Sequence, residues 1–235
     1  MREHPLLMKG PLVRATLEGR KTQTRRPIKP QPDDDIVDVR YDAIADLWLG
    51  NTPEDNDLGY TSSWAMRCPL GQAGDRLWVR ETYKWADAKD DGVNQSVVVA
   101  YRADDKTMDI ECSLAVHDGV VCAIESEEVC GERWRPSIHM PRWACRLVMP
   151  LVAVRVERLR GITEDDAKAE GVERISAGPG WECWMGYGPG PSCGTARDSF
   201  RSLWISIYGQ DSWDANPWVW VAEWDHVEVS SGSEG

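Results

Sequence analysis

Phenylalanine is almost absent from this sequence, which has one Phe among 235 residues but thirteen Trp and six Tyr. The first residues, MREHPLLMKG, lack a secretory pattern, and no apolar run is long enough to cross a membrane. The seven Cys include no CxxC pair, and their odd number argues against a disulfide framework. We therefore expect a cytoplasmic protein with reduced thiols and no membrane partner.

An excess of positive charge is absent as well, because the formal net charge is −12. Binding along a nucleic-acid backbone needs a basic face, so this total argues against a surface that follows a long nucleic acid. A local basic patch stays open, since basic residues gather in 14–29 and 133–160. The many Trp rings suit a core, or a pocket that holds a flat ligand of nucleoside size.

Four residues have a spacing that loosely resembles that of zinc ligands: Cys112, His117, Cys122 and Cys130. Structural zinc sites usually anchor such a set with a CxxC pair, which is lacking here. Buried, unreactive thiols are the favoured interpretation, and the sequence leaves zinc open. We predict no metal and no cofactor.

Local signals predict several helices and strands. Gly10-Pro11 opens a short helix that Gly19 closes. Thr163 and Asp166 form a capping box for a helix that Gly171 ends. The remaining predicted elements are an amphipathic helix over 195–209 and strands over 74–81, 96–104, 144–159 (with Pro150 at a bulge or break) and 217–229.

This mixture, without alternation of strands and helices, predicts a compact α+β fold around a small β-barrel. Residues 27–70 hold five Pro and many Asp and Asn, which is typical of an insertion or long loop. The Gly- and Pro-rich residues 175–195 suggest a second insertion. We expect one domain over 1–229 and a disordered tail over 230–235.

The stretch EGRKTQTRRP, residues 18–27, places basic side chains around Thr24. A threonine hydroxyl is a poor nucleophile unless a base removes its proton, and Lys21 is near enough to do so if its pKa falls. Lowering a lysine pKa from about 10.4 to about 7–8 requires burial or neighbouring positive charge. Arg20, Arg25 and Arg26 supply such charge, although a solvated basic turn explains the same residues.

Glu170 is a candidate general acid. It lies in the last turn of the helix that begins after Thr163, beside unpaired carbonyls and the negative end of the helix dipole. A carboxyl in that place is expected to have a raised pKa, which suits an acid that works near neutrality. A surface Glu on a polar helix is the structural alternative.

The segment GRKTQTRR resembles the ASCH-domain signature G-x-K-x-x-[ET]-x-R, with Gly19, Lys21, Thr24 and Arg26 in register. GDRLWVRE (74–81) resembles the family's G-D-x-L-x-V strand, and LRGITEDDAKAEGV (159–172) resembles the helix that faces its cleft. ASCH domains are similar to PUA domains, so the resemblance implies a PUA-like small β-barrel with flanking helices and loop insertions.

Threonine in the motif is similar to the pattern of small bacterial N(4)-acetylcytidine amidohydrolases. That likeness implies Thr24 as the nucleophile, Lys21 as the base and Glu170 as the acid. It covers only the motif, the strand and the helix, because insertions at 27–70, 103–133 and 175–195 depart from those enzymes. The whole length, including WRPSIHMPRWACRL (134–147), resembles long ASCH proteins of bacteriophages and prophages, which would place the chain in the host cytoplasm.

Further residues are candidates for substrate binding. Arg26 lies two residues after Thr24 on an extended segment and is suited to hold a carbonyl or phosphate. The other five candidates are Trp78 (a stacking ring, or part of the core), Arg80, Glu81 (a cleft group, or half of a strand-end salt bridge), His139 and Arg142. The two last residues belong to the bacteriophage-type segment.

The sequence therefore predicts an amidohydrolase that cleaves an acyl amide on a nucleoside or modified nucleobase. A PUA-like module that binds RNA or a modified base without chemistry is one alternative. A metal-independent ribonuclease that uses the same Lys and Arg cluster is another. The oligomeric state and the true substrate stay open.

Overall fold

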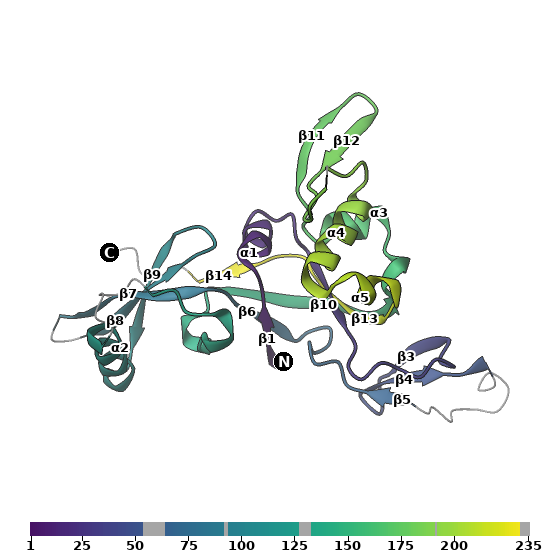
Figure 1. Ribbon diagram of the computed structural model, residues 1–235. Helices are drawn as coiled ribbons and strands as arrows, with labels where there is room; N and C mark the ends of the chain where they lie inside the picture. The colour runs from purple at the N-terminus through teal and green to yellow at the C-terminus, as the bar shows by residue number, and fades with distance from the viewer. Residues whose placement is uncertain (54–63, 92–93, 127–132, 191, 231–235) are drawn as a thin grey trace. The chain divides into compact units, whose positions relative to one another are not determined.

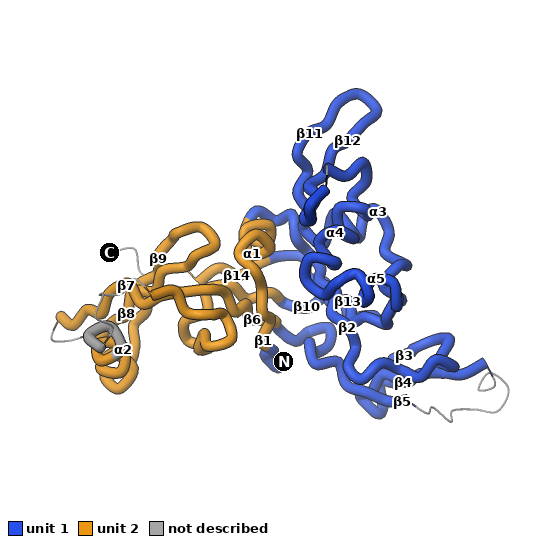
Figure 2. Tube along the Cα trace, in the orientation of Figure 1, with its two compact units in different colours: residues 1–4, 18–76, 150–226 blue, residues 5–17, 77–149, 227–235 orange. Residues whose placement is uncertain are grey.

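The computed structural model describes residues 1–53, 64–91, 94–126, 133–190 and 192–230, with the side chains of 123–126 excepted. Two compact units emerge from this mixed α+β chain (Figure 2). Unit 1 comprises residues 1–4, 18–76 and 150–226, and unit 2 comprises residues 5–17, 77–149 and 227–235. None of the helices within the described ranges is long and apolar enough to span a membrane.

Three antiparallel strands form the centre of unit 1: β10 (Leu147–Arg158, from Pro150 onward), β13 (Trp218–Trp224) and β2 (Gln23–Pro27). The middle strand β13 is buried along its length except at Glu223, which explains its nearly continuous apolar sequence. Its residues pair with both neighbours, so that Ala222 lies opposite Val154 on one side and Thr24 on the other.

Three helices accompany this sheet in unit 1 (Figure 1): α3 (Glu164–Ala169), α4 (Ala196–Tyr208) and α5 (Gln210–Asp214). The predicted capping box begins α3, because Thr163 accepts from the Asp166 backbone and the Asp166 side chain accepts in return. Helix α4 buries its predicted apolar stripe at Phe200, Leu203 and Trp204. The short 3-10 helix η4 (Leu159–Gly161) connects β10 to α3.

The segment 27–70 is not a long loop, and that part of the prediction is wrong. It contains a three-stranded sheet of β3 (Asp38–Asp42), β4 (Leu47–Asn51) and β5 (Trp64–Met66). Trp48 of β4 packs edge-on against Trp220 of β13, with ring centroids 5.6 Å apart. Packing against a distant strand therefore orders a segment whose Pro and Asp content is typical of a loop.

The Gly- and Pro-rich segment 175–195 also contains structure that the sequence did not predict. Strands β11 (Arg174–Gly178) and β12 (Trp181–Trp184) form an antiparallel hairpin. Gly180 turns the chain between them at a φ of 79°, a conformation that favours glycine. After the hairpin, Met185 and Tyr187 lie against α4: Ser199 Oγ donates to the Met185 carbonyl, and the Tyr187 backbone N–H donates to Ser202 Oγ.

Unit 2 contains an antiparallel sheet of β7 (Tyr83–Asp90), β8 (Gln95–Tyr101) and β9 (Thr107–Cys112), and α2 (Leu114–Ser126) packs on it. Its helices also include α1 (Gly10–Leu17) and the 3-10 helices η2 (Ser137–His139) and η3 (Arg142–Ala144). Strand β1 (Glu3–Leu7) pairs with β6 (Arg76–Arg80), which pairs with β10. The first residues of β10 also pair with β14 (Glu228–Val229). The core of this unit includes Tyr83, Trp85, Val97, Val99, Tyr101 and Met140.

Several local predictions are confirmed, including α1 before Gly19 and strands within 74–81, 96–104, 144–159 and 217–229. The chain does not break at Pro150, because β10 continues through it with a register shift between Leu151 and Ala153. The predicted barrel is not seen as such, since no sheet in the described parts closes on itself. The single domain over 1–229 stays a prediction, and all of the predicted tail except Ser230 lies outside the described residues.

Candidate active site

Lys21 lies at the start of the motif segment and is 1% exposed. Its backbone forms an isolated bridge with Glu170, between the end of α3 and the segment that enters β2. The Nζ atom donates to the Gln23 carbonyl at 2.7 Å, to the Glu170 carbonyl at 2.9 Å and to Glu170 Oε2 at 2.9 Å. All three ammonium protons therefore have acceptors.

Glu170 caps the C-terminal end of α3 and is 4% exposed. Gly171 follows with a φ of 83°, which turns the chain away from the helix. A lysine near the C-terminal end of a helix interacts favourably with the helix dipole and with the last carbonyls of the helix. The contacts of Lys21 to the carbonyl and to the carboxylate of Glu170 are therefore stabilising. Glu170 is thus not the surface residue of the structural alternative.

Arg25 holds the second oxygen of the Glu170 carboxylate. Its Nη1 atom donates to Glu170 Oε1 at 3.0 Å, while Nε and Nη2 donate to Glu157 Oε1 at 2.9 and 2.6 Å. Nη2 also lies 3.3 Å from Asp166 Oδ2. The Arg25 side chain has no exposed area, so this guanidinium is a buried hub between β10, α3 and the motif strand.

The protonation of Lys21 is set by opposing effects. Burial lowers the pKa of Lys21, the Glu170 carboxylate raises it, and the positive charges of Arg26 and Arg25 lower it further, with a net shift below the ordinary value. Desolvation is the largest cause because it disfavours the charged form. The direction agrees with the requirement for a general base.

Thr24 is 3% exposed and pairs with Ala222 in β13. Side chains alternate along a strand, and Gln23 and Arg25 are the β2 residues whose side chains contact α3 or its cap. Thr24 and Arg26 therefore share the other face of β2, where Arg26 Nη1 donates to Tyr208 Oη at 3.3 Å. Within the described residues, no hydrogen bond joins the Thr24 hydroxyl to Lys21 or Glu170. Their meeting in one cleft stays a prediction.

Four of the other candidates belong to unit 2 and lie near one another within it. The Trp78 ring has the guanidinium groups of Arg80 and Arg142 at 5.4 and 5.8 Å from its centroid. Arg80 also donates through Nη2 to the Ile138 carbonyl, and the neighbouring His139 carbonyl accepts from Tyr83 at 3.0 Å. His139 and Arg142 are exposed, whereas Trp78 and Arg80 are half-buried.

Glu81 is 1% exposed and shows the salt-bridge alternative rather than the cleft position. Both of its oxygens accept from Arg146, each at 2.9 Å, and Arg146 also donates to both oxygens of Asp104. Burial raises the pKa of Glu81, although the Arg146 contacts oppose the shift. Glu81 therefore forms a buried salt bridge inside unit 2, as in the alternative of a strand-end salt bridge.

Metal ligands do not gather in the described parts of the chain, where no group of three or more His, Cys, Asp or Glu has the arrangement of a metal site. Cys112 lies in β9, while His117 and Cys122 lie in α2. The fourth member of the zinc-like set, Cys130, lies outside the described residues. The question of zinc at these positions therefore rests on the sequence.

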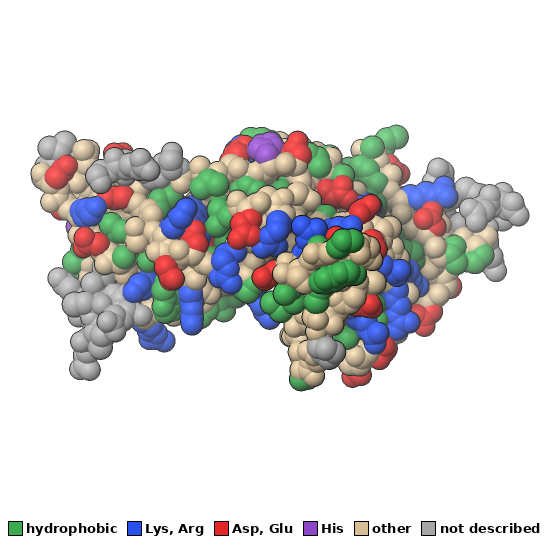
Figure 3. Space-filling view, turned by 90° about the horizontal axis from the view of Figure 1, so that it is seen from above, with side chains coloured by type: hydrophobic (Ala, Val, Ile, Leu, Met, Phe, Trp, Pro, Cys, Tyr) green, Lys and Arg blue, Asp and Glu red, His purple; other side chains and the backbone are tan. Residues whose placement is uncertain are grey.

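The sequence did not single out Arg25 as a site residue, nor Glu157 and Asp166 as its partners. The available signal was the alternation of polar Gln23 and Arg25 in β2, which indicates a second polar face. Basic and acidic side chains also lie next to one another over the face seen in Figure 3. This intermixing agrees with the salt bridges that Arg25, Arg146 and Arg155 form with neighbouring carboxylates.

Comparisons with protein-family models, curated proteins and solved structures give no match for this chain. The geometry is therefore the basis for a functional assignment. Its central element is the direct contact between the Lys21 ammonium and the Glu170 carboxylate, both nearly excluded from water.

Proposed function

We propose that unit 1 carries an amidohydrolase site for an acylated nucleoside or nucleobase, of the N(4)-acetylcytidine type. The observation that carries the proposal is the buried contact between Lys21 Nζ and Glu170 Oε2 at 2.9 Å. These two residues are the base and the acid that the ASCH resemblance implies, and they are 149 positions apart in the chain.

The ion pair is one proton transfer away from the forms that catalysis needs. Moving a proton from Lys21 Nζ to Glu170 Oε2 leaves a neutral amine and a protonated carboxyl. Burial lowers the pKa of Lys21 because desolvation disfavours the ammonium form, and this is the direction that the transfer needs. A general base must be able to accept a proton and a general acid must carry one, so a single shift along the existing hydrogen bond prepares both groups.

The reaction then proceeds in two halves. The Thr24 hydroxyl oxygen forms a bond to the acyl carbon and its proton passes to Lys21, giving a tetrahedral intermediate. Glu170 donates its proton to the departing amine nitrogen as the C–N bond breaks, leaving an acyl-Thr24 ester. Water then attacks this ester while the Glu170 carboxylate accepts its proton, and the Lys21 ammonium returns a proton to the departing Thr24 oxygen. The carboxylic acid product is released, and Thr24, Lys21 and Glu170 regain their starting forms. Arg26, on the Thr24 face, is suited to hold a substrate carbonyl.

The fold expected with this activity is PUA-like. The supporting features are the motif strand β2, the strand that follows Gly74-Asp75 and the short helix α3, which have the order of the ASCH resemblance. Under this proposal, the sheet of unit 1 corresponds to part of the PUA-like barrel. The β3–β5 sheet and the β11–β12 hairpin are then additions that shape the substrate site.

The proposal is tested by incubating the full chain with N(4)-acetylcytidine, other acylated nucleosides and a short RNA. Release of the free nucleoside, followed by chromatography, is the expected result. The Glu170→Gln variant is expected to lose turnover, because the amide cannot donate an acid proton to the leaving group. Lys168→Gln, an exposed position in the same helix, is the matched control and should retain activity. Unchanged turnover in Glu170→Gln would remove the acid from the mechanism.

Base or RNA binding without chemistry is a second candidate, and one observation favours it. Trp78 in unit 2 is flanked by the cations of Arg80 and Arg142, as in sites where a ring stacks on a base and cations hold phosphates. Binding of the short RNA with no consumption of any acylated nucleoside would select this function.

A further inference from the structure

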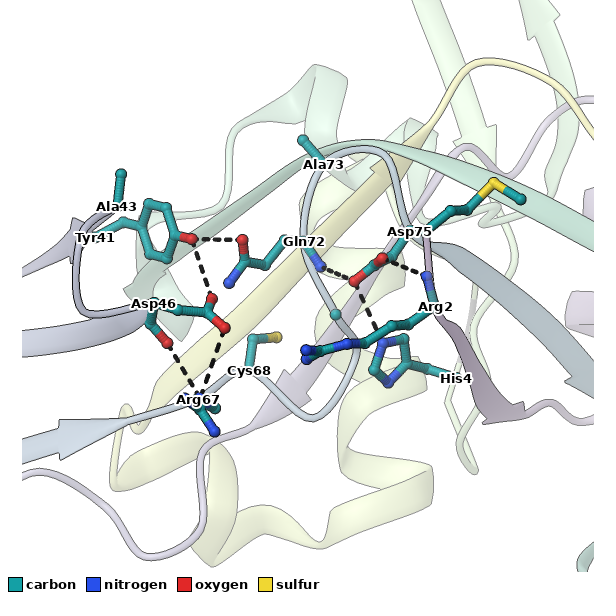
Figure 4. A pocket seen from close by; sticks show the side chains of 12 residues that line it. Arg2, His4, Tyr41, Ala43, Asp46, Arg67, Cys68, Gln72, Ala73 and Asp75 are labelled. Carbon is teal, nitrogen blue, oxygen red and sulfur yellow. Dashed lines mark hydrogen bonds and ion pairs between the residues drawn. The ribbon is translucent and has the colours of Figure 1, made fainter.

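A polar pocket lies in unit 1, separate from Lys21 and Glu170 in its lining residues (Figure 4). Its volume is about 330 Å³, within the lower range for small-molecule sites. Its wall is built from the first residues of the chain up to β1, the β3–β4 turn and the loop between β5 and β6. The residues that matter for binding are Arg2, His4, Tyr41, Asp46, Arg67 and Gln72.

Asp75 organises one wall of the pocket. Its carboxylate accepts the backbone N–H of Arg2 at 2.6 Å and that of Gln72 at 3.3 Å. Burial raises its pKa, but these hydrogen bonds and the neighbouring His4 outweigh it and lower the pKa below the usual value. Gly71 lies behind this wall, where an added Cβ would come within 2.7 Å of the His4 ring. The wall is therefore fixed by its own bonds.

Donors outnumber acceptors on the open side. The Arg2 side chain extends across the pocket toward Cys68 (Figure 4), and its guanidinium has no ion pair or hydrogen bond with the described part of the chain. Gln72 accepts from Tyr41 through Oε1, which leaves its Nε2 group as a donor. Arg67 Nε contacts Asp46 weakly, at 3.4 Å from its carbonyl and 3.6 Å from its carboxylate, and the Arg67 side chain is 67% exposed.

His4 lies beside Asp75 in the same wall and makes one long polar contact with it. Its Nε2 atom is buried, lies 3.4 Å from Asp75 Oδ2 and makes no hydrogen bond with any described residue. Buried polar atoms without a partner are uncommon in folded proteins and often mark a ligand or water position. Within the described residues, the pocket therefore presents several polar groups whose hydrogen-bonding capacity is only partly used.

We infer that this pocket binds a small phosphomonoester, with the phosphate between Arg2, Arg67 and the Gln72 amide. The three donor groups come from two segments: Arg2 precedes β1, and Arg67 and Gln72 lie five residues apart in the loop between β5 and β6. A tetrahedral phosphate presents oxygens in several directions, whereas a carboxylate presents two in one plane. Guanidinium groups match phosphate through paired N–H donors, and two of them balance a dianion. Asp46 and the Tyr41 hydroxyl are placed to contact the hydroxyls of the organic part.

The test is a calorimetric titration of the full chain with inorganic phosphate and with a simple sugar phosphate. We expect saturable binding, weakened about tenfold or more by Arg2→Gln and by Arg67→Gln, since each removes charge-assisted hydrogen bonds. Asp46→Asn is expected to tighten binding, because it frees Arg67 and removes a negative charge. Arg40→Gln is the matched control: among the described residues Arg40 pairs only with Asp38, and it does not line the pocket.

Three outcomes overturn the inference. They are the absence of saturable binding, equal affinity loss in Arg40→Gln and the two pocket variants, and tighter binding of acetate than of phosphate. Circular dichroism of each variant establishes that the fold is retained. The result is independent of the amidohydrolase proposal, because none of the pocket residues belongs to the Lys21 site.

Discussion

Lys21 and Glu170 contact each other through two different bonds, since the lysine ammonium donates both to the backbone carbonyl and to the carboxylate of the glutamate. The carbonyl bond belongs to the capping of α3, and the carboxylate bond belongs to the proposed chemistry. One side chain therefore links the position of the helix end to the protonation of the acid.

Thr24→Ala is expected to abolish deacylation of N(4)-acetylcytidine while the fold is retained. Loss of an activated nucleophile should reduce kcat at least about a thousandfold. Thr24→Ser keeps a hydroxyl and should retain measurable turnover. Rates are measured by chromatography after circular dichroism of each variant. Deacylation at the same rate in Thr24→Ala would contradict the mechanism, and RNA cleavage by that variant would favour a ribonuclease.

Removing either partner of the Lys21–Glu170 pair should destabilise the chain strongly, because it leaves a buried charge with fewer partners. We expect Lys21→Met and Glu170→Gln each to lower the free energy of unfolding by about 3–5 kcal/mol. The double variant should cost less than the sum, with a coupling of about 0.5–3 kcal/mol. Urea unfolding gives the free energy of unfolding of the parent chain, the two single variants and the double variant. Strict additivity would show that the contact contributes nothing.

Asp166 should contribute stability that is lost in acid. Burial raises its pKa, but hydrogen bonds from Gln23 and Thr163 and the Arg25 charge bring the pKa down to about 2, from an ordinary value of 3.8. A carboxyl with a lowered folded pKa stabilises fully above the unfolded value, and the contribution disappears as pH falls from about 4 to 2.

The Asp166→Asn variant checks this sign. At neutral pH it should be less stable than the parent chain by on the order of 1–2 kcal/mol, after allowance for solvent screening. The difference in unfolding free energy should shrink as pH falls through the same window. Asp165→Asn, whose side chain in the parent is 96% exposed, is the control and should show little difference. A gap that stays constant down to pH 2 would contradict the assignment.

If unit 2 binds RNA or a modified base, Trp78 is expected to supply the stacking surface. Trp78→Ala should weaken binding of a short single strand by about 1–3 kcal/mol, the usual contribution of one base on an aromatic ring. Fluorescence anisotropy of a labelled strand at fixed salt measures the effect. Trp181→Ala is the control, since Trp181 is 55% exposed in the hairpin of unit 1. Equal losses in the two variants would argue against a Trp78 site.

Local chemistry made the helices α3 and α4 predictable from the sequence. The capping residues Thr163 and Thr195 and the apolar spacing at Phe200, Leu203 and Trp204 are signals that act within a few residues. The β3–β5 sheet was not predictable in this way, because its order depends on contact between Trp48 and a strand some 170 positions later in the chain. Its Pro and Asp content favoured the loop interpretation.

Some residues of the candidate site were predictable from the sequence, and others were not. The motif resemblance predicts that Lys21 and Glu170 belong to one site, whereas local sequence patterns do not. Arg25 was missed because its importance arises from partners on two distant elements, Glu157 and Glu170. The salt bridge of Glu81 also depends on a partner that is distant in the sequence, because Arg146 is 65 positions away.

Helix α3 is a spacer of fixed length between its capping box and Glu170. It has six residues, Glu164–Ala169, and both ends are bonded to other parts of unit 1. Each helical residue adds about 100° of rotation and about 1.5 Å of rise. One inserted or deleted residue would therefore turn the glutamate carboxylate away from the lysine, even with every site residue intact. The number of residues in α3 therefore sets how the Glu170 carboxylate is aligned with Lys21.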